Sequence, residues 1–198
     1  MARDMGPVLK KCRSLGIEPA VLGISKKSNR KFLRAGKKVS EYGTQLREKQ
    51  KAKFIYGVEE RPFRTNFIKA QKLKYGTVGE NMLIRLELRL DNVIFRLGFA
   101  RTRREARQIV THRHVTVNGK LVLAPSYIVS VNDAIAIKES AKSSQRYKDV
   151  LEATNGRLVP SWLTSDREAL SGTVAAIPTR DQIDVPVNET AIVELYSK

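Results

Sequence analysis

The side chains best suited to bind a ligand are six cations that lie close together in the middle of the chain. They are Arg101, Arg103, Arg104, Arg107, Arg113 and Lys120. A guanidinium group presents two parallel N–H donors, which match the oxygens of a phosphate group. Such crowding favours a surface that binds nucleic-acid phosphates, although arginines on a solvated helix face are also common.

Two helices are predicted to lead into and carry these cations. Apolar residues at helical spacing predict one helix over Leu86–Gly98, which ends at its glycine. Thr102 and Glu105 have the spacing of a capping box and predict a second helix. One face of that helix holds Ala106, Ile109 and Val110 for the core, and the neighbouring face holds Arg103, Arg104, Arg107 and Thr111.

A small antiparallel sheet is expected to follow. Val115–Val117 and Lys120–Val122 flank Asn118-Gly119, the pair that type I′ hairpin turns favour. The alternation over Ala134–Ile137 predicts one further strand, which we expect to be the last.

The stretch Arg89–Lys120 as a whole resembles the RNA-binding module named after the fourth protein of the small ribosomal subunit. Several RNA-binding proteins share this module, so the resemblance implies RNA binding and leaves the kind of protein open.

Composition and charge restrict the class of protein and its kind of partner. The chain has 198 residues, 41% of them hydrophobic, and a formal net charge of +17, which points to a polyanionic partner. The first 150 residues hold 33 basic and 13 acidic side chains, whereas residues 151–198 hold four and seven. One cysteine allows no intramolecular disulfide, and neither a secretory apolar segment nor a membrane span of about 20 residues is present. We therefore expect an intracellular protein.

Residues 1–40 form a basic extension of low hydrophobic content. A short helix is predicted from about Val8 to Leu15, ended by Gly16. The basic residues after it show little apolar periodicity, so we expect an arm that is disordered in the free protein and orders along RNA. Arg30 and Lys31 are expected among its RNA contacts.

Residues 41–88 are predicted to form a helical domain. Ser40 caps a first helix that closes at Gly57, and a second spans about Glu59 to Leu73 with Pro62 in its first turn. Aromatic side chains at helical spacing are expected in the core: Tyr42, Tyr56, Phe63 and Phe67. RNA contacts are expected from Gln45, Arg47, Lys49, Lys51, Lys53, Arg61, Arg64, Lys69 and Lys72.

These helical sequences and the end of the chain resemble the family of bacterial-type small-subunit ribosomal protein four. The similar segments cover nearly the whole chain in order and include Ser40–Lys51, Tyr56–Arg61, Gly79–Asn81, Pro160–Leu163, Gly172–Val174, Pro186–Glu189 and Ile192–Ser197. We expect an α+β protein with three parts: the basic extension 1–40, the helical domain 41–88 rejoined by a segment of about 175–198, and the RNA-binding module with its extension, 89–174.

The resemblance also implies a function. It implies a structural constituent of the small ribosomal subunit, in the cytoplasm, that binds 16S ribosomal RNA directly and nucleates assembly of the subunit body. It further implies a contribution to translational accuracy through neighbouring small-subunit proteins, especially protein five. It implies no catalysis, no cofactor, no membrane partner and no small-molecule substrate.

The sequence departs from the family in its metal ligands. Many members hold zinc through cysteines of the N-terminal extension, but Cys12 stands alone here, and the resemblance places Ser25, Lys26 and Asn29 at the positions of further ligands. Tetrahedral zinc needs four nitrogen or sulfur ligands, so we expect no zinc site.

Three other groups have ordinary interpretations. His112 and His114 lack further metal ligands nearby, so we expect a helix-end cation and a polar contact in the hairpin. Arg89-Leu-Asp91 is similar to a short catalytic motif of pseudouridine synthases, but it lies inside the module's own first helix. A structural use is therefore favoured, either as charge at the helix N-terminus or as an Arg–Asp contact.

The acidic end of the chain is expected to face protein. Ile192, Val193, Leu195 and Tyr196 are too apolar for a free tail, so we predict that they pack against residues 41–88. Glu189 and Glu194 would then remain available to neighbouring proteins.

Two alternatives share the RNA-binding module. An RNA-modifying enzyme would carry a catalytic domain besides the module, for which this short chain shows no sequence signature. A free-standing RNA-binding stress factor would need neither the helical-domain signature nor the acidic end.

Overall fold

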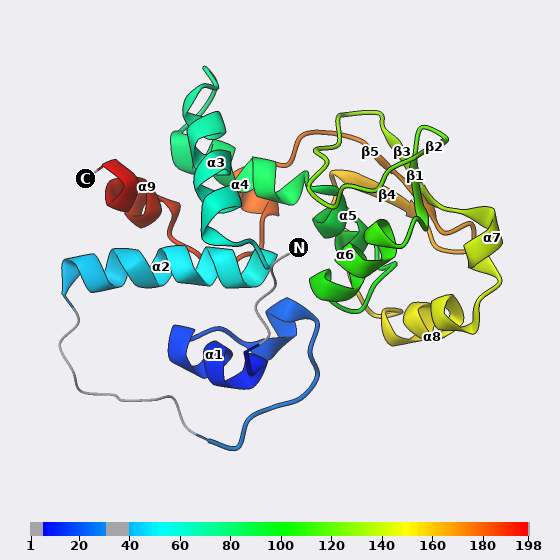
Figure 1. Cartoon of the computed structure of the whole chain (residues 1–198), viewed down its shortest axis with the longest axis horizontal. Coiled ribbons are helices and arrows are strands. Elements are labelled where there is room, and N and C mark those ends of the chain that lie inside the picture. The colour runs from blue at the N-terminus through cyan, green and yellow to red at the C-terminus, as the bar shows by residue number, and fades with distance from the viewer. Residues whose placement is uncertain (1–5, 31–39, 198) are drawn as a thin grey trace. The chain divides into compact units, whose positions relative to one another are not determined.

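The computed structural model of the chain describes residues 6–30 and 40–197 (Figure 1). The described residues form two compact units. The first lies within Met1–Leu83 and Asp184–Lys198, and the second within Ile84–Ile183. Helices and one antiparallel sheet make the protein an α+β protein.

The first unit is helical. It contains α1 (Val8–Leu15), a 3-10 helix (Pro19–Leu22), α2 (Glu41–Tyr56), α3 (Glu60–Gln71), the first part of α4 (Val78–Glu87) and α9 (Glu189–Ser197). None of the helices in the described ranges is long and apolar enough to cross a membrane.

The N-terminal extension is more ordered than its composition predicts. The short helix is confirmed as α1, which ends at Gly16 in the left-handed conformation. Cys12, Ile17 and Leu22 are buried, so residues 8–22 pack as part of the helical unit, whereas the disordered arm was expected from the basic residues that follow the helix. These three side chains, in α1, in the 3-10 helix and between them, attach the segment to the helical unit. So few apolar residues give only a weak periodic signal of structure in the sequence. Lys31 lies outside the described residues.

The two predicted helices of the first unit are confirmed as α2 and α3. The Ser40 hydroxyl accepts a hydrogen bond from the N–H of Gly43, and Gly57 ends α2 in the left-handed conformation. Pro62 falls in the first turn of α3, where its missing N–H breaks no helical hydrogen bond. Phe63, Phe67 and Tyr56 are buried as expected, but Tyr42 is 58% exposed, which corrects its placement in the core.

Helix α9 packs against α2 and α3. Ile192 is fully buried, and the ring of Tyr196 stacks on that of Phe67 with centroids 4.6 Å apart. The Tyr196 hydroxyl donates a hydrogen bond of 3.0 Å to Glu60 of α3. Glu60 also pairs with Lys49 and Lys53 of α2, at 3.0 and 2.8 Å, so one carboxylate connects all three helices.

The second unit is built on a five-stranded antiparallel sheet in the order β2-β1-β3-β5-β4. The strands are β1 (Val115–Val117), β2 (Lys120–Leu121), β3 (Ala134–Ile137), β4 (Leu163–Asp166) and β5 (Ser171–Val174). The unit's helices are α5 (Leu90–Arg96), α6 (Arg103–Thr111), α7 (Glu139–Lys142), α8 (Gln145–Ala153), the end of α4 and a 3-10 turn at Arg180–Gln182. Their shared core includes Leu90, Ile94, Leu97, Phe99, Ile109, Val115, Ile135, Trp162 and Val174.

The helix predicted over Leu86–Gly98 is two helices. Helix α4 ends at Glu87 and α5 begins at Leu90, because Arg89 is extended and pairs with Ile128 as an isolated antiparallel bridge. The N–H groups of Leu90 and Asp91 donate to the carbonyls of Tyr127 and Pro125. The apolar spacing continues across the break, so the sequence pattern conceals it.

The predicted hairpin is confirmed. Asn118 and Gly119 both have positive φ, 50° and 76°, as a type I′ turn requires. Strand β3 has the bounds that the alternation predicted, Ala134–Ile137, but it is not the last strand, since β5 pairs with it and β4 pairs with β5. The strands β4 and β5 are short and largely polar. Gly172 in β5 packs so closely that an added Cβ would lie 2.6 Å from the Leu97 side chain, which explains a glycine inside a strand.

Candidate nucleic-acid interface

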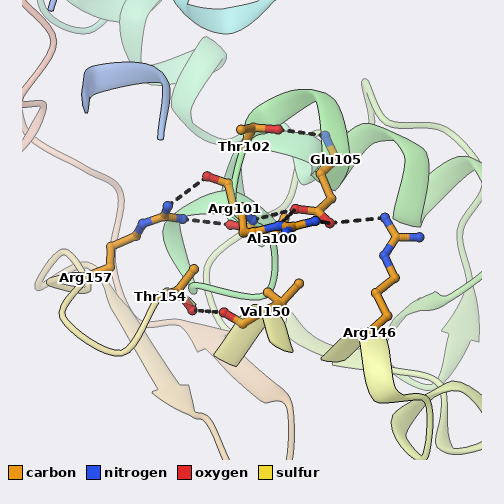
Figure 2. Close-up of polar contacts among 8 residues, drawn as sticks. All are labelled: Ala100, Arg101, Thr102, Glu105, Arg146, Val150, Thr154 and Arg157. Carbon is orange, nitrogen blue, oxygen red and sulfur yellow. Dashed lines mark hydrogen bonds and ion pairs between the residues drawn. The ribbon is translucent and has the colours of Figure 1, made fainter. Parts of the chain in front are cut away.

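Helix α6 carries most of the predicted RNA-binding cations and begins with a side-chain cap. The Thr102 hydroxyl accepts a hydrogen bond of 3.2 Å from the N–H of Glu105. The Glu105 carboxylate accepts a return bond of 2.8 Å, from the N–H of Arg101 and not from that of Thr102 (Figure 2). The capping box is therefore present with its return bond shifted by one residue.

Glu105 also orients two arginines from different parts of the unit. Its carboxylate pairs with Arg101 at 3.2 Å and with Arg146 of α8 at 3.4 Å (Figure 2). Partial burial by itself would raise the pKa of Glu105, but the hydrogen bonds and charge of Arg101 and the charge of Arg146 outweigh it and lower the pKa. Glu105 is therefore held ionised at neutral pH, and α8 is connected to the first turn of α6.

The turn between α5 and α6 is stabilised by a third arginine. Arg157 donates to the carbonyls of Phe95, Ala100 and Arg101 at 2.8–2.9 Å, and its guanidinium lies 4.2 Å from the centre of the Phe95 ring. Figure 2 shows it reaching the turn from the loop after α8. Thr154, at the end of α8, adds a bond of 2.8 Å to the carbonyl of Gly98.

Sequence reasoning missed the parts played by Arg146, Thr154 and Arg157. All three act on a turn that lies 41–62 residues away in the chain. No local pattern marks such contacts.

An acidic residue at the start of α5 fixes two further arginines. Asp91 accepts two bonds from Arg89, of 3.0 and 2.8 Å, and two from Arg107, of 3.0 and 2.7 Å. Of the two structural uses expected for Arg89-Leu-Asp91, the Arg–Asp contact is present, and Asp91 also lies in the first turn of α5. The Arg107 side chain is 16% exposed and lies against α5, so part of its charge is compensated inside the unit.

Arg103 is part of the interior. It is 6% exposed, donates to Asn92 at 2.7 Å and lies 4.3 Å from the centre of the Phe95 ring. Asn92 in turn donates to Glu87, a fully buried carboxylate that Arg96 binds through two hydrogen bonds. The helical pattern places Arg103 on the face beside the core face, but its side chain is buried, because the α5–α6 interface is polar at this point.

Three of the six central cations are exposed and unpaired in the described structure. Arg104 in the first turn of α6, Arg113 just after its end and Lys120 in the hairpin are exposed. Within the described ranges, none of their side chains has a hydrogen bond or an ion pair. Arg101 is 57% exposed although it pairs with Glu105. These four are the cations of this region best placed to meet phosphates.

The residues predicted to bind RNA in the helical unit also divide into some that are paired within the unit and some that are exposed without a partner. Lys49 and Lys53 pair with Glu60, Lys51 pairs with Glu48, and Gln45 is buried with its amide on Glu194 and Glu41. The exposed members, whose side chains lack ion pairs within the described parts, are Arg30, Arg47, Arg61, Arg64, Lys69 and Lys72.

The two carboxylates assigned to protein contacts differ in their surroundings. Glu194 is exposed, but one of its oxygens accepts the 2.9 Å bond from Gln45 of α2, so it also secures α9. The Glu189 side chain is half-buried and lies where a Cβ on Gly79 would contact it at 2.8 Å. Gly79 thus allows α9 to approach α4 within the helical unit.

The histidines and the cysteine do not form a metal centre in the described structure. The His112 and His114 rings are 6.4 Å apart, and burial, His112, Arg146 and Lys138 together lower the pKa of His114. Burial raises the pKa of the Cys12 thiol. No group of three or more histidine, cysteine or carboxylate side chains suited to a metal occurs among residues 6–30 and 40–197.

Comparison with known proteins identifies the family. The pattern described as "Ribosomal protein S4/S9 N-terminal domain" matches residues 3–87, and the "S4 domain" matches residues 88–135, which contain α5, α6, the hairpin and the start of β3. A protein of Lachnoclostridium phytofermentans named "Small ribosomal subunit protein uS4" is 74% identical over the full length of both chains. Proteins of the same name from Lachnospira eligens and Fusobacterium nucleatum are 67% and 50% identical, again over both full lengths. The chain therefore belongs to the family of small ribosomal subunit protein uS4.

Proposed function

We propose that this protein binds 16S ribosomal RNA as a structural, non-enzymatic constituent of the small subunit. In this role it works in the cytoplasm, within the ribosome. The match with uS4 proteins over the whole chain carries the proposal. It also weighs against an RNA-modifying enzyme or a free-standing stress factor, which would share only the S4 domain.

The proposed contacts are RNA phosphates bound by exposed cations of both units. Arg104, Arg113, Lys120 and Arg101 supply the donors in the S4 domain, and Arg47, Arg61, Arg64, Lys69 and Lys72 supply them in the helical unit. Arg103 and Arg107 act mainly by fixing α6 to α5 through Asn92 and Asp91. Because the backbone that carries the exposed cations is already fixed, binding has to order only their side chains, which suits a protein that holds RNA helices in one arrangement.

Assembly and accuracy follow as the finer part of the proposal. A protein that binds ribosomal RNA before its neighbours fixes an RNA junction on which the subunit body is built. Contacts with small-subunit proteins, protein five in particular, are assigned to the acidic C-terminal region, where Glu189 and Glu194 lie. Arg30 and Lys31 of the N-terminal extension are proposed to add RNA contacts.

A footprint of the full chain on naked 16S ribosomal RNA tests the proposal. We expect protection of one compact junction at salt concentrations where large-subunit ribosomal RNA shows no localised protection. Protection that is diffuse, or equal on both RNAs, would refute specific and early binding.

A further inference from the structure

The loop between α3 and α4 carries the most exposed tyrosine of the described chain. Tyr75 is 83% exposed, whereas Tyr42 and Tyr127 are 58% and 41% exposed. Its side chain has no hydrogen bond, ion pair or ring contact within the described residues. An aromatic ring so far out of the core adds nothing to the packing of the helical unit.

The backbone around this tyrosine is nevertheless fixed. The Asn81 amide donates to the carbonyl of Tyr75, and Gly76 turns the chain with a φ of 61°. Thr77 and Glu80 then cap α4 reciprocally: the Thr77 N–H donates to Glu80 at 3.1 Å, and the Glu80 N–H donates to the Thr77 hydroxyl at 3.2 Å. Figure 1 shows this loop projecting beyond the end of α3. The exposed ring is thus carried by a turn whose backbone is fixed.

The surroundings of Tyr75 are cationic. Lys74 directly precedes it in the chain, Lys72 caps the end of α3 and Lys69 lies in the last turn of α3. All three lysines are exposed without an ion pair among the described residues. An exposed ring next to exposed, unpaired lysines has the composition of a single-strand RNA contact, in which lysines track the backbone and the ring stacks on a base.

We propose that Tyr75 stacks on an unpaired base of the ribosomal RNA, with Lys72 and Lys74 on the phosphates beside that base. The inference rests on the proposed function and adds a base contact to the phosphate contacts. Because the backbone of the turn is already ordered, stacking has to restrict only the side chain of Tyr75.

The first test compares substitutions of Tyr75 in the full chain for affinity to 16S ribosomal RNA. We expect Tyr75→Phe to bind like the parent and Tyr75→Leu to bind roughly 5- to 150-fold more weakly, the range that loss of one stacked base gives. The salt dependence of binding should be unchanged in Tyr75→Leu, which keeps every cation, and shallower in Lys74→Gln. The matched control is Tyr42→Leu, whose neighbours Glu41 and Gly43 supply no cation, and it should bind normally.

The outcomes separate this inference from the proposed function. Normal binding by Tyr75→Leu, with weakened binding by Arg104→Gln and Arg113→Gln, would overturn the stacking alone. Normal RNA binding by Tyr75→Leu together with poor joining of a neighbouring small-subunit protein would also overturn it, because the ring would then contact protein. Normal binding by all of these variants would refute both.

A spectroscopic readout checks the contact without relying on affinity. The native tryptophan, Trp162, is 1% exposed in the core of the other unit. In Tyr75→Trp, RNA should quench the added, exposed fluorescence, while in Tyr42→Trp it should leave that fluorescence nearly unchanged. Equal quenching in both variants would contradict a stacked base at position 75.

Discussion

Substituting Arg103 by glutamine should destabilise the second unit far more than the same change at its neighbour Arg104. Both are arginines of the first turn of α6, and the sequence alone treats them alike. In the structure, Arg103 is 6% exposed, donates to Asn92 at 2.7 Å and lies 4.3 Å from the Phe95 ring centre. Arg104 is exposed.

The expected cost follows from these contacts. A hydrogen bond from a charged donor contributes about 1.5–3 kcal/mol, and a desolvated cation–π contact about 0.5–2 kcal/mol. The terms overlap, so we expect Arg103→Gln to lower the free energy of unfolding by about 2–4 kcal/mol. Arg104→Gln, a surface change, should stay within about 0.5 kcal/mol.

Urea unfolding followed by Trp162 fluorescence measures this difference, since the chain's single tryptophan is buried in the core of the second unit. A double-mutant cycle with Asn92→Ala should give a coupling energy of about 0.5–3 kcal/mol for the Arg103–Asn92 pair. Equal stability losses in Arg103→Gln and Arg104→Gln, or a coupling near zero, would refute the division into structural and exposed arginines.

Three further predictions concern the first unit. Truncation after Pro186 removes α9 and should speed hydrogen exchange in residues 41–71 but not in the second unit; unchanged exchange there would contradict the docking of α9. Partial burial would raise the pKa of Glu60, but hydrogen bonds from Lys53, Lys49 and Tyr196 lower it from 4.5 to about 2. The ionised Glu60 carboxylate therefore contributes its full stabilisation above pH 4.5 and loses it as the pH falls through about 2. The difference in free energy of unfolding between the parent and Glu60→Gln should accordingly shrink as the pH is lowered from 4.5 to 2; a constant difference would contradict this. Because Cys12 has no partner cysteine, elemental analysis should find no stoichiometric zinc and chelators should not unfold the protein; one zinc per chain would show otherwise.

The sequence predicted several helix ends and the hairpin turn correctly, because these features depend on neighbouring residues alone. The caps Ser40 and Thr102, the stops Gly16 and Gly57, and the Asn118-Gly119 turn each act within a few residues, and the structure has them as expected. Periodicity alone was misleading at Arg89, because pairing with Ile128 interrupts a helix whose apolar spacing continues.

Features that depend on distant partners were not predicted. Strands β4 and β5 are short and polar, and they exist because β3 offers an edge and Leu97 leaves room only for Gly172. The sequence also could not show which arginines are buried and which are exposed, since burial of Arg103 depends on Asn92 and Phe95 of another helix. Helical spacing gives the face on which a cation lies, but the partner across that face decides whether it is free to bind RNA.

The central claim is that exposed cations of the S4 domain, and not bulk charge, bind the RNA. The most direct test is affinity for 16S ribosomal RNA across a salt series, for Arg104/Arg113/Lys120→Gln and for the control Lys138/Lys142/Lys148→Gln, which removes the same charge from the segment 138–148. We predict a large fall in affinity for the first variant, with a salt slope shallower by about 0.7–0.9 for each phosphate that the protein no longer neutralises. The control should retain nearly all of its affinity and slope. Equal losses of affinity in the two variants would contradict the claim.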